Sequence, residues 1–508
     1  MGTITVGEPL TIADVVAVAR ERAQVALSAL ARERMAASRA LVERLVEEGH
    51  TVYGITTGVG ELAGVRISPA QSAQLQVNII RSHSAGVGEP LPDEVVRAMM
   101  LLRAHALAQG YSGVREQPVA LLLALLNRGL HPVIPAQGSV GASGDLAPLA
   151  HLALALIGEG EIRSEGGVVP AARALQAAGL EPVTLAPKEG MALINGTQLM
   201  TACGALAVHD ALELAVCADI AGAMTAEALG AQVEAFDPLI HALRPHPGQQ
   251  ASAGNLRRLL EGSEVLASAP ARAKAQDAYA LRCMPQVHGA CRDAMTYAAQ
   301  VVEIEINSAT DNPLVFAAAQ RVISGGNFHG QPVALALDLL AIAASALAGI
   351  AERRIERLVN PHLSGLPAFL TRDGGLHSGL MLAQYTAAAL VSENKVLSHP
   401  SSVDSIPTSA NQEDHVSMGA IAARKARAVV GHAQQVLGIE LLCAAQALDL
   451  RAPLRPAPGT GAARAALRAL VPTLAGDRVL APDLAAVRRL VAEGTVRRSV
   501  EAVIGELA

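Results

Sequence analysis

The chain has 508 residues, of which 51% are hydrophobic and 2% aromatic, and its formal net charge is −6. This length suffices for a large buried core, and the acidic balance excludes the broad basic surface typical of nucleic-acid binding. The five cysteines are widely spaced without a C-x-x-C motif, which excludes a cysteine-based zinc or redox motif. With no signal-peptide layout in the first residues, we expect a cytoplasmic protein.

The apolar pattern predicts a mainly α fold built from long helices. A capping box of Thr11 and Asp14 predicts a first helix that continues to about Glu48. A second helix is expected from Pro92 to just before Gly110. Four longer segments keep an apolar spacing of about 3.6 residues, namely 200–231, 286–308, 331–358 and 415–449. Such lengths are typical of a bundle of packed helices.

Three consecutive parts of one cooperative unit are expected along the chain. Residues 1–200 form a smaller, loop-rich N-terminal part, and residues 201–450 form the central bundle of long helices. Residues 451–508 form a linker and a small helical tail, because 452–461 are rich in proline, glycine and alanine. Polar residues that could take part in catalysis or binding gather in irregular segments between the helices, where a rigid scaffold positions functional loops.

One segment, Val333–Ala351, has the length and apolar character of a membrane span. Asp338 interrupts it, and alanine and serine dilute it. A helix that is apolar on all sides also suits the centre of a bundle. We therefore expect a buried core helix and no membrane association.

The run from Gly138 to Pro148 is chemically the most informative, because it contains Ala142-Ser143-Gly144. Gly144 has no side chain to guard its backbone nitrogen. In a tight loop this nitrogen can attack the carbonyl carbon of Ala142, and loss of two waters then closes a five-membered ring and turns Ser143 into an alkene. The chain can thereby make an electrophile, which no ordinary side chain supplies and which usually comes from a cofactor.

Residues 138–151 resemble the signature of the histidine and phenylalanine ammonia-lyase family, and the likeness extends over roughly residues 8 to 450. In that family the tripeptide becomes 4-methylidene-imidazol-5-one. The resemblance implies that this group forms autocatalytically from Ala142, Ser143 and Gly144, with no external cofactor. It also implies the long-helix bundle of the aromatic amino acid lyases and a homotetramer whose active sites mix residues from several subunits.

An ammonia-lyase must remove a weakly acidic β-proton and let a poor leaving group, the amine, depart. The resemblance implies that Tyr53, in the glycine-rich segment 53–60, is the base and that Tyr279 is a second catalytic tyrosine. It implies that Arg282 grips the substrate carboxylate, which a planar guanidinium can do through two parallel hydrogen bonds. If this segment is one helix, Tyr279, Arg282 and Gln286 share a face.

Three further residues are implied to bind the substrate. Gln276 belongs to the same segment as Arg282. Asn195, in a sharp loop between helices, is implied to contact the ring or the substrate amine, and Phe328 to pack beside the ring and the substrate. Without the family context, Asn195 fits a turn-forming amide and Phe328 an aromatic loop anchor, while Arg282 fits a solvated charge on a helix.

His83 and Glu413 match the pattern of histidine-specific members of the family. A buried glutamate can accept the N–H of an imidazole in a charge-assisted bond, whereas a phenyl ring leaves that carboxylate unpaired. We therefore expect elimination of ammonia from L-histidine to give trans-urocanate, the first step of histidine degradation, with Glu413 both binding and catalytic. The evidence against tyrosine is weaker, because its hydroxyl can also donate.

Three alternatives are considered at this point. A tyrosine or phenylalanine ammonia-lyase or an aminomutase uses the same scaffold, and a non-catalytic helical scaffold protein needs none of the chemistry. A serine hydrolase at Ser143 needs Gly-x-Ser-x-Gly, but Asp145 occupies the place of the second glycine. We expect no metal, because His241 and His246 lie in a proline-rich segment without a cysteine or carboxylate pattern.

Overall fold

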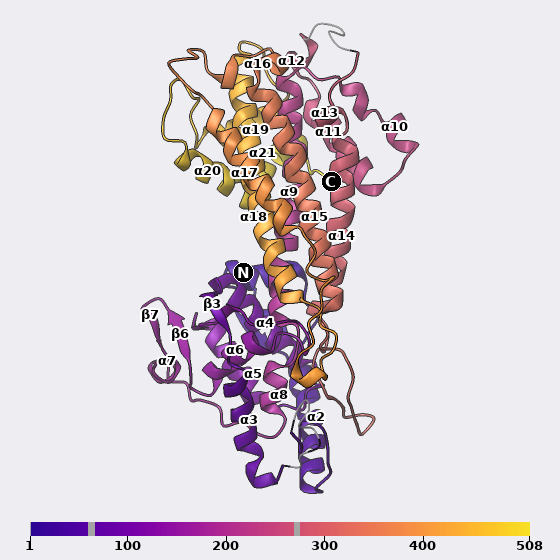
Figure 1. Ribbon diagram of the computed structural model, residues 1–508, viewed down its shortest axis with the longest axis vertical. Coiled ribbons are helices and arrows are strands. Elements are labelled where there is room, and N and C mark those ends of the chain that lie inside the picture. Colours follow the sequence, from indigo (N-terminus) through magenta and orange to yellow (C-terminus); the bar gives the residue numbers. More distant parts are fainter. Residues whose placement is uncertain (1, 59–63, 65–66, 269–274) are drawn as a thin grey trace. The chain divides into compact units, whose positions relative to one another are not determined.

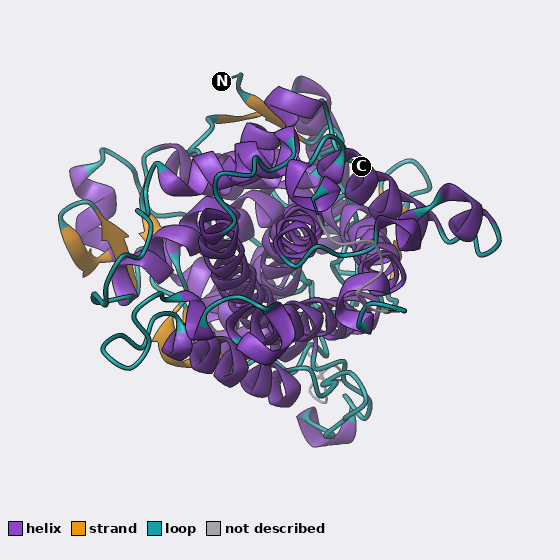
Figure 2. Cartoon of the chain, turned by 90° about the horizontal axis from the view of Figure 1, so that it is seen from above, coloured by secondary structure: helices purple, strands orange, loops and turns teal. Residues whose placement is uncertain are grey.

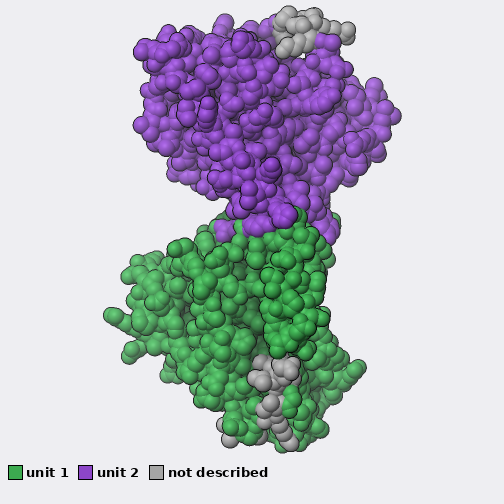
Figure 3. All heavy atoms as spheres, in the orientation of Figure 1, with its two compact units in different colours: residues 1–209, 299–338, 400–424 green, residues 210–298, 339–399, 425–508 purple. Residues whose placement is uncertain are grey.

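The computed structural model describes residues 2–58, 64, 67–268 and 275–508, and within them helices dominate and strands are short (Figure 1, Figure 2). The chain divides into two compact units, each assembled from three segments (Figure 3). Unit 1 comprises residues 1–209, 299–338 and 400–424, and unit 2 comprises residues 210–298, 339–399 and 425–508. The predicted division of the sequence near residues 200 and 450 stays a prediction.

The four predicted long helices are confirmed within about four residues at each end. They are α9 (Gln198–Ala228), α14 (Met284–Ile306), α15 (Gln331–Val359) and α18 (Gly419–Leu450). Each contributes residues to both units. The predicted helix after Pro92 is also confirmed, as α4 (Asp93–Ala108), in which every residue from Val95 to Ala108 is buried.

Unit 1 holds most of the short elements. Its other helices are α1 (Ile12–Arg20), α2 (Ala29–Glu47), α3 (Pro69–His83), α5 (Glu116–Asn127), α6 (Leu146–Leu156), α7 (Ala171–Ala177) and α8 (Glu189–Ile194). Its strands are β1 (Ile4–Val6), β2 (Val25–Leu27), β3 (Val87–Pro90), β4 (His131–Pro132), β5 (Pro135–Gln137), β6 (Glu161–Ser164), β7 (Gly167–Pro170), β8 (Leu314–Phe316) and β9 (Arg321–Ile323). The β1–β2 pair is parallel, whereas β3–β5, β4–β6–β7 and β8–β9 are antiparallel.

The single helix predicted from Thr11 to about Glu48 is wrong. The capping box is present, since Thr11 Oγ1 accepts from Asp14 N and Asp14 Oδ2 accepts from Thr11 N. Helix α1 nevertheless ends at Arg20, and β2 follows because its backbone pairs with β1. A second cap then starts α2, where Ser28 Oγ accepts from Ala31 N at 3.0 Å.

Unit 2 adds shorter helices to its parts of the long ones. They are α10 (Pro238–Ala242), α11 (Pro247–Leu260), α12 (Glu264–Ala267), α13 (Tyr279–Arg282), α16 (Pro361–Ser364), α17 (Met381–Leu397), α19 (Pro458–Arg468), α20 (Ala481–Ala492) and α21 (Thr495–Ile504). Helix α19 begins inside the segment 452–461, which the sequence predicts to be a linker.

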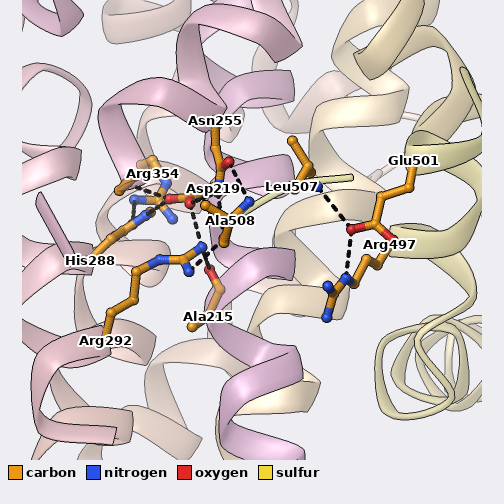
Figure 4. Close-up of polar contacts among 11 residues, drawn as sticks. Ala215, Asp219, Asn255, His288, Arg292, Arg354, Arg497, Glu501, Leu507 and Ala508 are labelled. Carbon is orange, nitrogen blue, oxygen red and sulfur yellow. Dashed lines mark hydrogen bonds and ion pairs between the residues drawn. The ribbon is translucent and has the colours of Figure 1, made fainter. Parts of the chain in front are cut away.

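A buried network of charges ties the helices of unit 2 together (Figure 4). Asp219 of α9 accepts from His288 Nδ1 at 2.8 Å and from Arg292 Nη2 at 2.7 Å, both on α14. Arg354 of α15 contacts His288 Nε2 at 3.1 Å and pairs with both carboxylate oxygens of Glu440 on α18. Burial raises the pKa of Asp219, but Arg292 and His288 together lower it below its ordinary value. The charges thus compensate one another inside the bundle.

Three helices, α9, α15 and α18, have the length and apolar composition of membrane spans. In α15, which contains the segment 333–351, 61% of the most apolar window is buried inside the protein, and in the other two the share is 78%. Their apolar residues therefore serve mainly as core.

Candidate active site

A cavity of about 800 Å³ in unit 1 gathers seven of the predicted site residues. They are Tyr53, His83, Ala142, Ser143, Asn195, Phe328 and Glu413. These residues are up to 360 positions apart in the sequence, from Tyr53 to Glu413 (413 − 53), and the fold brings them to one place. Each of them lies at a helix end or in a loop, which is where a rigid helical scaffold exposes polar groups.

The cavity also has lining residues to which the sequence patterns assigned no role. They are Leu146, Met191, Asn312, Ser324, Gly325, His329, Ser409, Gln412, Asp414 and His415. The rings of His329 and His415 stack with centroids 5.9 Å apart and an interplanar angle of 3°. His329 and His415 lie next to Phe328 and close to Glu413 in the sequence, and this proximity could have indicated them.

Close backbone contacts clamp the loop that carries the tripeptide. Gly144 has φ of +76°, and a Cβ on it would lie 2.0 Å from the carbonyl oxygen of Gly196. Gly141 has φ of +67°, and its carbonyl oxygen accepts from Ser417 Oγ at 2.8 Å. Asp145 N donates to Gly196 O at 2.6 Å. Only glycine fits at these two positions, so the loop that carries the tripeptide is tightly packed.

Asp145, next to the tripeptide, is a fully buried carboxyl group. Its Oδ1 accepts from Ser139 Oγ at 3.0 Å, and its Oδ2 accepts from Met200 N at 3.0 Å, in the first turn of α9. Burial raises the pKa of Asp145 from 3.8 to about 7, although the hydrogen bonds from Met200 and Ser139 oppose that shift. The group is therefore held close to its protonation midpoint at neutral pH.

This raised pKa predicts a pH effect on stability. Between pH 3.8 and about 7, Asp145 keeps its proton in the folded chain but loses it in the unfolded chain. The free energy of unfolding of the wild type therefore falls as the pH rises through this range. From pH 5 to pH 8, the free energy of unfolding of Asp145→Asn should rise by roughly 2–3 kcal/mol relative to that of the wild type, because asparagine does not titrate. Denaturant unfolding of both chains at the two pH values measures this change. A difference between the chains that is the same at both pH values would contradict it.

The hydroxyl of Ser143 is hydrogen-bonded to the residue expected to select the substrate. Ser143 Oγ donates to Glu413 Oε1 at 2.9 Å, and Thr408 Oγ1 donates to Glu413 Oε2 at 2.9 Å. The backbones of Thr408 and Glu413 also pair with each other. Each carboxylate oxygen has a second lone pair, so Glu413 is fixed in place and can still accept a hydrogen bond from a ligand.

His83 ends α3 with one ring nitrogen committed. Its Nδ1 lies 2.8 Å from the carbonyl oxygen of Ile79. Because a carbonyl oxygen only accepts, Nδ1 carries the proton, and Nε2 of the neutral ring is an acceptor. His83 and Glu413 therefore both offer acceptors to the cavity.

Tyr53 is half-buried at the start of a turn, and Gly54 N there donates to Thr57 Oγ1 at 3.2 Å. Residues 59 and 60 of the glycine-rich segment 53–60 lie outside the described residues.

Three predicted residues, Gln276, Tyr279 and Arg282, belong to unit 2 and do not line this cavity. Tyr279 is 70% exposed, and the guanidinium of Arg282 lies 4.7 Å from the centre of its ring. The single helical face expected from Tyr279 to Gln286 is wrong, because α13 ends at Arg282 and α14 begins at Met284. Pro285 explains the break, since proline lacks the N–H that would continue the helix.

Among the described residues, no group of three or more histidine, cysteine, aspartate or glutamate side chains could hold a metal ion. The five cysteines are free thiols, four of them buried. The cavity lining offers a tyrosine, a histidine, a carboxylate, an amide and the first two residues of the tripeptide, namely Tyr53, His83, Glu413, Asn195, Ala142 and Ser143.

Comparison with known proteins identifies the family. The chain matches the family model of the aromatic amino acid lyases over residues 10–469. It is 61% identical over 507 residues to a histidine ammonia-lyase of Symbiobacterium thermophilum, with 100% of both chains covered. It is 59% identical over 502 residues to a histidine ammonia-lyase of Gloeobacter violaceus, with 99% of this chain and 98% of the other covered.

Solved structures agree with this likeness. The crystal structure of histidine ammonia-lyase from Trypanosoma cruzi matches with a TM-score of 0.93 and 47% identity, covering 99% of this chain and 95% of that one. A tyrosine aminomutase from Streptomyces globisporus matches with a TM-score of 0.93 and 41% identity, covering 99% of both chains. The chain belongs to the aromatic amino acid lyase family. The lyase-type bundle expected from the sequence is confirmed, and the protein is a carbon–nitrogen lyase.

Proposed function

We propose that the chain acts as a histidine ammonia-lyase, eliminating ammonia from L-histidine to give trans-urocanate in the first step of histidine degradation. The observation that carries this proposal is the contact between Ser143 and Glu413, with His83 lining the same cavity. This contact supports recognition of an imidazole beside the residue that would become the electrophile. The close relatives that are histidine ammonia-lyases support the same reaction.

The proposed cofactor is 4-methylidene-imidazol-5-one, made from Ala142, Ser143 and Gly144. The residues present fit such a group, because the loop is clamped and Gly144 has no room for a Cβ. When formed, the group supplies an electrophile that makes the substrate amine a better leaving group. No external cofactor is required.

The chain's own residues bind the substrate and move its proton. His83 Nε2 and the Glu413 carboxylate suit an imidazole, which has two N–H groups in its cationic form. Tyr53 removes the β-proton, and its place in the cavity supports that role. Asn195 binds the reacting end of the substrate, and Phe328 packs beside its ring.

We propose a homotetramer in which Gln276, Tyr279 and Arg282 of one subunit complete the site of another. The absence of all three from the residues that line the cavity supports this arrangement. Large apolar side chains exposed on α15 and α17 support it too, since oligomers bury such faces. Examples are Ile342 (44% exposed), Leu382 (51%) and Tyr385 (64%).

We also propose a cytoplasmic enzyme that binds neither nucleic acid nor membrane. The free cysteines support a reducing compartment. The negative net charge argues against a nucleic-acid partner. The small-molecule substrate is then the only ligand that the reaction needs.

Turnover assays with L-histidine, L-tyrosine and L-phenylalanine test the proposal. We expect urocanate absorbance to rise with histidine alone. Release of a β-amino acid from tyrosine or phenylalanine would favour an aminomutase, as in the tyrosine aminomutase of the same fold. No product from any of the three would favour a non-catalytic scaffold.

Glu413→Gln should lower kcat/KM for L-histidine roughly 10- to 100-fold, because a neutral amide replaces a charge-assisted hydrogen bond to the imidazole. Steady-state kinetics measure the effect, and intact mass establishes that the ring has still formed. Asp414→Asn is the matched control, because it neutralises the neighbouring carboxylate of the same cavity. An equal loss of kcat/KM in both variants would contradict a specific role of Glu413.

A further inference from the structure

The side-chain amide of Asn195 is held in one orientation. Asn195 follows α8, is 3% exposed and lines the cavity. Its Nδ2 donates to the carbonyl oxygen of Asn312 at 3.1 Å and reaches Asp311 Oδ1 at 3.4 Å. Both partners only accept, so the NH₂ group must face them. The other atom of the amide, Oδ1, is buried and accepts no hydrogen bond within the described part of the chain.

A buried ion pair fixes the carboxylate on which this orientation depends. Lys188 Nζ lies 2.6 Å from Asp311 Oδ2, and both side chains are at most 1% exposed. Asp311 Oδ1 also accepts from Asn312 N at 2.7 Å. Asp311 Oδ2 therefore pairs with Lys188, whereas Asp311 Oδ1 accepts from the amide of Asn195. Removing two charges from water is costly, so the pair calls for an explanation beyond packing.

The backbone of Asn195 is fixed as well. Arg103, fully buried in α4, donates from Nη1 to the carbonyl oxygen of Asn195 at 2.8 Å and to Gln198 Oε1 at 2.9 Å. The amide can thus reorient only about its own side-chain torsions. The Asp311 carboxylate opposes that rotation, because it would bring Oδ1 of the amide against a negative charge.

We propose that Asp311, held by Lys188, is a positioning residue that keeps Asn195 Oδ1 unpaired within the described chain, as an acceptor for the α-ammonium group of the substrate. A free carbonyl oxygen can accept from the N–H donors of an ammonium but has nothing to donate to a carboxylate. The inference rests on the proposed function, and it assigns the amine, rather than the carboxylate, to Asn195. Asp311 and Lys188 act through Asn195 and need not touch the substrate.

Asp311→Asn tests this role by comparing two ligands. In this variant the carboxylate no longer opposes rotation of the Asn195 amide, and only the carbonyl oxygen of Asn312 still favours its orientation. The KM for L-histidine should rise roughly 10-fold, as expected for a lost hydrogen bond to a charged group. The inhibition constant of imidazolepropionate, which keeps the ring and the carboxylate but lacks the amine, should change less than about 2-fold. Intact mass first verifies that the ring has formed, and Asp404→Asn, at an exposed aspartate of unit 1, is the matched control.

A second variant separates positioning from folding. Asp311→Asn alone leaves Lys188 charged and buried, so Lys188→Met with Asp311→Asn removes both charges together. The double variant should show the same selective loss for the amine-bearing ligand. Equal weakening of both ligands, or no weakening of either, would overturn the proposal. If the wild-type chain does not turn over histidine, the proposed function fails, and calorimetric binding of the two ligands still decides whether Asp311 governs amine recognition.

Discussion

Replacing Ser143 with alanine is expected to abolish turnover of L-histidine, by three orders of magnitude or more, while the chain stays folded. Alanine has no hydroxyl to lose as water, so no alkene and no electrophile can form at this position. The intact mass should equal that calculated from the sequence, whereas the wild-type mass should be lower by two waters. The hydrogen bond from Ser143 Oγ to Glu413 Oε1 belongs to the uncyclised chain. The cyclised wild type has lost that hydroxyl as water, so the variant loses no stability through this bond relative to it.

Ser324→Ala provides the matched control, because Ser324 lines the same cavity. It should keep the mass loss of two waters and most of the activity. Turnover by Ser143→Ala at the wild-type rate would refute the self-made electrophile. A wild-type chain that shows no mass loss yet eliminates ammonia would refute it independently.

The long helices could be predicted from the sequence because their signal is local. Apolar residues repeat at helical spacing over 20 to 30 positions, and the observed helices α9, α14, α15 and α18 follow that pattern. The first predicted helix failed because pairing of β2 with β1 is not local. Two signals in the sequence were available, namely Ser28 as a second cap and Pro285 as a helix start.

Only those residues of the candidate site that lie in recognisable motifs could be predicted from the sequence. Resemblance pointed to Tyr53, His83, Asn195, Phe328 and Glu413, and the fold brings them into one cavity. The lysine and aspartate that orient the Asn195 amide are 123 residues apart (311 − 188) and form no motif. Such a pair becomes visible only when two loops meet in the folded chain.

The same close packing explains why residue 144 must be glycine. Its φ of +76° disfavours any other residue, and an added Cβ would lie 2.0 Å from Gly196 O and 2.3 Å from Gly196 C. These are backbone atoms, and Gly196 O also accepts from Asp145 N at 2.6 Å. Backbone atoms cannot move aside as the end of a flexible side chain can. The loops that carry Gly144 and Gly196 would therefore have to move apart.

Gly144→Ala is therefore expected to lose turnover to the level of Ser143→Ala and to show no mass loss, because the loop can no longer close tightly around the attacking nitrogen. Gly129→Ala is the matched control: its φ of +67° imposes a similar backbone strain, but nothing lies within 4 Å of its added Cβ. That variant should lose about 1–2 kcal/mol of stability and keep both the ring and the activity. Intact mass, histidine turnover and thermal unfolding of the two variants give the comparison. If Gly144→Ala loses two waters and stays active, the contact with Gly196 does not control formation of the electrophile.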